Sequence, residues 1–133
     1  MLNPSTADAR RDDPTIRRCI GFARTWGYGG VEVVNLFALR ATDPSRLRIA
    51  RDPVGPQNDA HIRAVARRSS ALVVAWGIHG ALRERDAAVL ALLSRRAPTH
   101  SLGWTKDGHP RHPLYLRRDA RLLPYGSVRR SAA

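Results

Sequence analysis

The chain has 133 residues, 43% of them hydrophobic, and a formal net charge of +12 at pH 7. This length fits one domain, residues 1–126, with a frayed polar tail at 127–133. There is no apolar run near the ~20 residues that cross a bilayer and no signal peptide, so we expect a cytoplasmic protein without a membrane partner. The single cysteine, Cys19, excludes a disulfide framework and a thiolate metal site; we expect no metal and no cofactor.

The positive charge has two explanations. A strongly basic domain favours a polyanionic partner, a nucleic acid or a nucleotide, because arginines that neutralise phosphates release counterions. However, Lys106 is the only lysine, so nearly all of the positive charge comes from arginine. A GC-rich genome favours arginine and alanine codons, and this bias alone can make a protein surface basic. Both explanations stay open at the level of composition.

The chain opens on a polar loop, Leu2 to Asp8, and then shows a helix start. Asp13 is placed as the N-cap and Pro14 as the first helical residue, and the helix is expected to end near Gly27. The β-branched run 31–37 predicts a buried strand, with Asn35 near its carboxyl end.

The stretch 38–56 shows no regular pattern and is punctuated by Asp-Pro and Gly-Pro pairs. Irregular segments of this length in small domains are usually functional or disordered. We expect its arginines to form part of an anion-binding rim, namely Arg40, Arg46 and Arg48.

The second half alternates helices and strands. The patterns predict a helix at 57–68, a strand at 71–76 closed by Gly77, a helix at 81–96, a short strand at 99–102 and a polar loop at 103–114. This alternation indicates an α/β fold with a parallel sheet, in which ligands bind beyond the carboxyl ends of the strands. Asn35, Gly77 and the loop after Leu102 would all lie at that edge.

Five segments carry a resemblance: LNPSTAD, DDPTIRRCIGFA, VVNLFALRATDP, AWGIHG and TKDGHPRHPLYL. Together they resemble an uncharacterised bacterial family of unknown function over about residues 2–116. Their order is also similar to that of the uracil-DNA glycosylase superfamily. This second resemblance implies a single-domain three-layer sandwich with a short, mostly parallel sheet, whose central first strand is largely truncated here at the N-terminus.

The glycosylase resemblance also implies roles for individual residues. Asn3 matches the residue that positions the attacking water, and Asn35 matches a polar position after the second strand. His109 or His112 matches the histidine that hydrogen-bonds the leaving base, in a loop that enters the minor groove. Ser5 stands where that family has glycine, and the last motif is one residue longer, which leaves the choice of histidine open.

An amide orients water but does not accept its proton, so Asp8 or Asp13 is the candidate base. The candidate catalytic residues are therefore Asn3, Asp8, His109 and His112. The candidate ligand-binding residues are Pro4, Ser5, Thr6, Asn35, Arg40, Arg46, Arg48, Gly77, Lys106 and Arg111. Each has a structural alternative, such as an Asx turn at Asn3 or a rigid turn at the His-Pro pairs.

Three functions compete on this evidence: an N-glycosidic hydrolase acting on nucleobases, a non-catalytic nucleic-acid or nucleotide binding module, and an enzyme acting on a different small molecule. The scattered positions of His61, His79 and His100 argue against a metal cluster.

Only Met1 and Leu2 remain to form the strand that leads into the Asn-Pro loop, against a usual strand of ~5–6 residues. We therefore expect the natural chain to start upstream of Met1 with a β-branched run. The 133-residue form should be poorly stable, or should fill the resulting gap with a partner strand.

Overall fold

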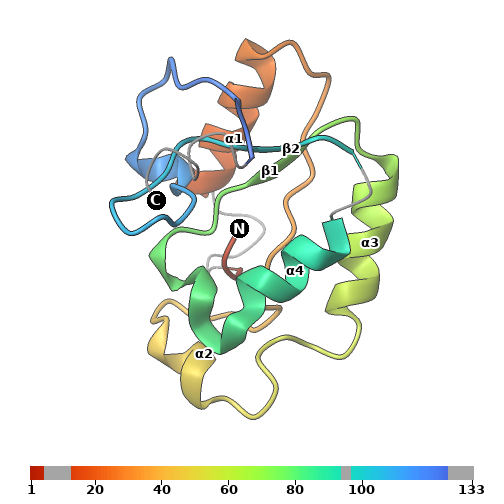
Figure 1. Ribbon diagram of the computed structural model, residues 1–133, viewed down its shortest axis with the longest axis vertical. Coiled ribbons are helices and arrows are strands. Elements are labelled where there is room, and N and C mark those ends of the chain that lie inside the picture. Colours follow the sequence, from red (N-terminus) through yellow and green to blue (C-terminus); the bar gives the residue numbers. More distant parts are fainter. Residues whose placement is uncertain (5–12, 94–96, 126–133) are drawn as a thin grey trace.

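The computed structural model describes residues 1–4, 13–93 and 97–125 (Figure 1). It is a mixed helix and strand protein, which confirms the α/β class. Its elements in chain order are α1 (Pro14–Thr25), α2 (Ser45–Ile49), α3 (Asn58–Arg68), β1 (Leu72–Val74), the 3-10 helix η1 (Ile78–Glu84), α4 (Arg85–Leu93), β2 (Thr99–Ser101), the 3-10 helix η2 (Pro113–Tyr115) and β3 (Leu123–Pro124).

The sheet is small and open, with the order β1-β2-β3. The pair β1 and β2 is parallel, with Leu72 opposite Thr99. Strand β3, which the sequence pattern did not predict, pairs antiparallel to β2, with Ser101 opposite Leu123. The predicted parallel connection through a helix is confirmed, since η1 and α4 lie between β1 and β2 in the chain.

The predicted strand 31–37 is extended but is not a strand of this sheet. Only its end is paired: the Met1 ammonium donates to Val34 O at 3.1 Å, Leu36 N donates to Met1 O at 3.0 Å, and Phe37 N donates to Leu2 O at 2.9 Å. In parallel pairing, one residue bonds to the two residues that flank the residue opposite it. Met1 does this with Val34 and Leu36. Residues 31–33 lack a ladder partner within the described ranges, which is why they fall outside a strand.

Two other boundaries differ from the prediction. The stretch 38–56 contains the short helix α2, whose start is fixed by Asp43, which accepts from Ser45 N at 2.9 Å. The helix expected from residue 81 begins at Arg85, because Leu82 and Arg83 have non-helical backbone angles, with φ of 55° at Arg83. The predicted tail 127–133 lies outside the described residues.

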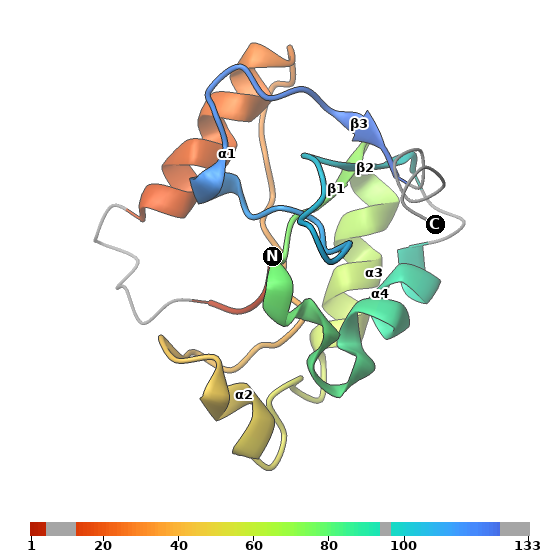
Figure 2. The ribbon, with the colours of Figure 1, turned by 60° about the vertical axis from the view of Figure 1, so that its left-hand side comes forward.

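The core is divided into two clusters on either side of β1. One cluster packs the sheet against α3 and α4 and includes Phe37, Ile62 and Val89. The other packs it against α1 through Phe22, Ala75 and Leu102. Figure 2 shows α1 on one side of β1 and β2 and the α3–α4 pair on the other. None of the helices described is both long and apolar enough to cross a membrane.

Candidate functional site

The carboxyl end of β1 meets the His-Pro loop at Gly77. Gly77 N donates to Pro110 O at 2.9 Å, and its φ of 76° with ψ of −163° is a conformation restricted essentially to glycine. A Cβ at Gly77 would lie 3.7 Å from the Cβ of His112. Glycine is thus favoured here by the backbone conformation, and the chain after β1 passes beside His112.

His112 is held in one orientation by the turn that it starts. Its Nδ1 accepts from Leu114 N at 3.2 Å, so in the neutral ring the proton is on Nε2. Burial lowers the pKa of His112, the nearby Met1 ammonium lowers it further, and Asp13 opposes both. The result is a neutral imidazole with an N–H donor, partly buried at the edge of the sheet.

His109 occupies a different position in the same loop. Its backbone closes a turn with Thr105: Thr105 N donates to His109 O at 2.7 Å, and His109 N donates to Thr105 Oγ1 at 3.0 Å. Trp104 and Pro110 form a bridge at the base of this turn. Of the two histidines that the sequence left open, the structure places His112 beside Gly77.

Asn3 ties the opening segment to the long loop. Its Nδ2 donates to Leu39 O at 3.1 Å and to Ala41 O at 2.9 Å, and the Pro4 carbonyl accepts from Ala41 N at 3.3 Å. Because these two loop carbonyls use both amide hydrogens, the side chain offers a further ligand only its Oδ1 as an acceptor. The nitrogen of the Asn3 side chain thus has a structural role, as a tie between the opening segment and the long loop.

Sequence reasoning missed two side chains that fix the strand end beside Asn35. Asn58 Nδ2 donates to Asn35 O at 2.9 Å and to Leu36 O at 3.1 Å. Arg85, 5% exposed, donates from Nε to Leu36 O at 2.7 Å and pairs with Asp59. The positions of Asn58 and Arg85 at helix starts gave no signal of these contacts, which join residues distant in sequence.

The N-terminus of α1 faces the same region. Asp13 caps α1 by accepting from Thr15 N at 2.8 Å. Arg18 donates from Nε to Pro113 O at 3.4 Å and lies over the Phe22 ring, which docks the His-Pro loop on α1. Burial raises the pKa of Cys19, with the Met1 ammonium opposing it.

Arginines border this edge on two sides. Arg40, Arg46 and Arg48 are exposed, the last two on α2, which Figure 2 shows on the opposite side of residues 1–4 from α1. A groove of about 570 Å³ lies between α1 and the segment after His112, and Arg17, Arg18 and Arg118 are among the residues that line it.

The remaining candidates are spread over the loop or fall outside the described ranges. Lys106 is exposed in the 105–109 turn, and Arg111 donates from Nε to Trp104 O at 3.1 Å. Ser5, Thr6 and Asp8 lie outside the described residues. Within the described ranges, no group of three or more His, Cys, Asp or Glu side chains is arranged to hold a metal ion.

Comparison with known families matches residues 1–114 to a family described as "Protein of unknown function (DUF1643)". Neither the curated proteins nor the solved structures give a match.

Proposed function

We propose that this chain, which belongs to the DUF1643 family, is a nucleobase- or nucleic-acid-directed protein whose site is the rim of Asn3, Gly77 and His112. The proposal includes a fold assignment finer than α/β: a three-layer sandwich like that of the uracil-DNA glycosylase superfamily. In that arrangement Met1 and Leu2 are the end of the central strand, and the rim lies beyond its carboxyl end.

The proposal depends on the protonation state and the orientation of His112. A departing nucleobase develops negative charge on its carbonyl oxygen, and the group that stabilises it must be a donor aimed at that oxygen. His112 is a neutral donor because Leu114 N occupies its Nδ1 and burial lowers its pKa. A donor fixed in this way at an active site contributes typically ~2.7–4 kcal/mol to catalysis.

Two exposed side chains follow His112 and support a nucleobase as the ligand. Tyr115 is 81% exposed, and its ring centroid lies 5.6 Å from that of His112. Leu114 is 42% exposed at the same tip. Aromatic rings of this kind stack on bases, at about 1–3 kcal/mol per base, and apolar side chains wedge between base steps. The arginine-lined groove beside this tip, together with Arg46 and Arg48 on α2, would take the phosphates.

The reaction proposed is hydrolysis of an N-glycosidic bond. Water attacks the sugar carbon, the bond to the base breaks with its electron pair leaving on the base, and the water's proton passes to a carboxylate. Asn3 Oδ1 would accept a hydrogen bond from that water. The proposal assigns this role to Asp13, whose charge acts on His112.

The first test is binding and its dependence on salt. Binding to a single-stranded oligonucleotide should weaken linearly on a log-log scale, with a slope of about −0.7 per phosphate contacted. Exchanging Arg46 and Arg48 for Glu should flatten that slope. The matched control exchanges Arg63 and Arg67, which are exposed on α3, for Glu and should change it less. A slope near zero in the unmodified protein would contradict a phosphate-bearing ligand.

The second test separates a hydrolase from a binding module. Free base released from a uracil-containing oligonucleotide is measured for the unmodified chain and for His112→Phe. Release that falls ~10²–10³-fold in the variant supports the hydrolase. Salt-dependent binding without release supports the binding module instead, in which Asn3 and Asp13 serve only as the loop tie and the helix cap.

A further inference from the structure

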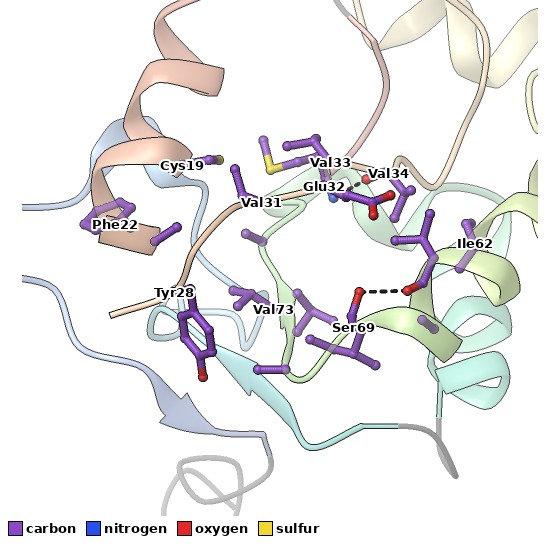
Figure 3. Close-up of a pocket in the computed structure, with 18 of the residues that line it drawn as sticks. Cys19, Phe22, Tyr28, Val31, Glu32, Val33, Val34, Ile62, Ser69 and Val73 are labelled. Atoms are coloured by element: carbon purple, nitrogen blue, oxygen red, sulfur yellow. Dashed lines mark hydrogen bonds between the residues drawn. The ribbon is translucent and has the colours of Figure 1, made fainter. Parts of the chain in front are cut away.

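The long loop, residues 38–54, follows an extended segment that an apolar pocket separates from β1. This pocket has a volume of about 530 Å³ and lies between residues 31–36 and the strand. Figure 3 shows Val31 on one wall of it and Val73 on the other. Because the segment that leads into the loop is set apart from β1 in this way, the position of the loop depends on contacts that it makes itself.

The loop is compact, and its two ends lie side by side. Ala38 N donates to Val54 O and Leu39 N donates to Pro53 O, each at 3.1 Å. Leu47, in the middle of α2, is fully buried in the core. Surface loops that close on themselves and pack their own side chains are frequently functional. Burial of one leucine is a non-directional contact, however, so it does not fix the direction in which the arginines of α2 point.

Arg83 supplies a directional contact to α2. Its Nη2 donates to Arg48 O at 2.8 Å and to Ala50 O at 2.5 Å. Carbonyl groups at the end of a helix have no partner within the helix, and a positive charge there also interacts favourably with the helix dipole. Helix α2 has only five residues, too few to be stable alone. Arg83 thus acts as a C-terminal cap that another element provides.

The backbone at Arg83 has an unusual conformation. Arg83 and Glu84 both have φ of 55°, in the left-handed region that residues with a side chain rarely adopt. Such a conformation costs free energy and persists only where the surrounding structure fixes it. It lies at the break between η1 and α4, and η1 begins directly after Gly77. One short element therefore carries the tie to α2 at its end and starts at the rim.

We infer that Arg83 is a positioning residue for the proposed site. It fixes α2 so that Arg46 and Arg48 hold the phosphates of the ligand in one place relative to the base at His112. The Asn3 amide holds the other end of the same loop, at two carbonyl groups. This inference rests on the proposed function, because the groups that Arg83 would position are phosphate contacts.

The test measures how the binding of a single-stranded oligonucleotide depends on salt. Arg83→Met keeps the aliphatic stem and removes the tie. Arg51→Met is the matched control, since Arg51 is exposed just after α2 and its exchange removes the same charge. Each phosphate contact contributes about 0.7 to the log-log slope, so Arg83→Met should reduce the slope by about 1.4, for the two arginines of α2. Arg51→Met should reduce it by no more than about 0.7.

Two further variants separate the side chain from the fold. Arg83→Lys keeps a charged donor and should retain the slope. Arg83→Gly suits the left-handed backbone, so this variant should remain folded and still lose as much slope as Arg83→Met. Hydrogen exchange reports on α2 without any ligand: the Ala50 amide, which donates to Arg46 O at 3.0 Å, should exchange at least ~10-fold faster in the Met and Gly variants and unchanged in the Lys variant.

A combined variant decides whether Arg83 acts through α2. In a chain that carries Arg46→Glu and Arg48→Glu, Arg83→Met should reduce the slope no further, because the groups that it positions are gone. A further reduction would show that Arg83 contacts a phosphate itself and would overturn the positioning role. A loss of slope in Arg83→Met no larger than that in Arg51→Met, or an unchanged exchange rate at Ala50, would also overturn it. These results leave the proposed function standing, whereas a slope near zero in the unmodified chain overturns both.

Discussion

The side-chain amide of Asn3 lies 2.9 Å from the carbonyl oxygen of Ala41, across 38 positions of sequence. This contact and its companion to Leu39 O anchor the long loop to the segment that opens the chain. Together with the bond from Ala41 N to Pro4 O, these contacts hold the arginine-bearing loop against the segment that opens the chain.

We expect Asn3→Ala to destabilise the protein by about 1–3 kcal/mol, because it leaves two part-buried carbonyl groups without a donor. Asn3→Asp should cost more, since it sets a carboxylate against the same two oxygens. Urea unfolding measures both. Asn35→Ala is the control, and an Asn3→Ala change no larger than that of Asn35→Ala would show that the loop does not depend on the amide.

The two Arg-carboxylate pairs should differ in their effect on stability. Arg85 has a side chain 6% exposed and pairs with Asp59, whereas Arg68 and Glu32 are 56% and 48% exposed. Breaking a fully buried pair costs about 3–5 kcal/mol, and the loss at Arg85 should be below this because Asp59 is 44% exposed, whereas an exposed pair contributes little. Arg85→Met should therefore lower the free energy of unfolding far more than Arg68→Met. Equal losses would contradict the burial of Arg85 in solution.

Much of the fold could be predicted from local pattern, and the exceptions share a cause. Asp13 as an N-cap and Pro14 as the first helical residue predict the start of α1. The apolar runs around Val73 and His100 predict two parallel strands. Arg85 could not be recognised, because an arginine at a helix start has the pattern of a surface residue, and only the tertiary structure brings Asp59 and Leu36 O to it. Helix α2 and the break at Arg83 likewise depend on tertiary contacts, here the Arg83 guanidinium donating to Arg48 O at 2.8 Å.

The candidate site was predictable only at the level of the sheet edge. Parallel topology brings Gly77 and the His-Pro loop together, as the structure shows. The two His-Pro dipeptides are locally alike, so sequence alone does not tell which histidine meets Gly77. The turn between Thr105 and His109 makes that difference, and it places His112 there.

The Met1 amine should make stability depend on pH. Burial lowers its pKa from 8.0 to about 6, with Cys19 opposing the shift. Between these values the unfolded chain holds more protons, so stability rises with pH across that window, by roughly 2–3 kcal/mol in total. His112, whose pKa is also lowered, adds a rise in the same direction below pH 6.5.

Urea unfolding at a series of pH values measures this dependence. Acetylating the Met1 amine should flatten the curve between pH 6 and 8 and leave the contribution of His112. A curve of the unmodified chain that is already flat in this window would show that the amine is solvated.

Gly80 and Gly21 should respond oppositely to alanine. A Cβ at Gly80 would lie 2.0 Å from Cδ1 of the buried Trp76, so Gly80→Ala should destabilise by about 1–3 kcal/mol. Gly21 lies in α1 with nothing within 4 Å of such an atom, and Gly21→Ala should stabilise by about 0.5–1 kcal/mol. Thermal melts of both variants measure the difference, and a neutral Gly80→Ala would mean that Trp76 packs differently.

The most direct measurement for the proposed site is the position of a bound nucleobase. A crystal of the unmodified protein soaked with uracil should show the base against Tyr115, with a carbonyl oxygen within about 3.2 Å of His112 Nε2 and a water within reach of Asn3 Oδ1. A base bound elsewhere, or one with His112 Nε2 turned away from it, would contradict the account.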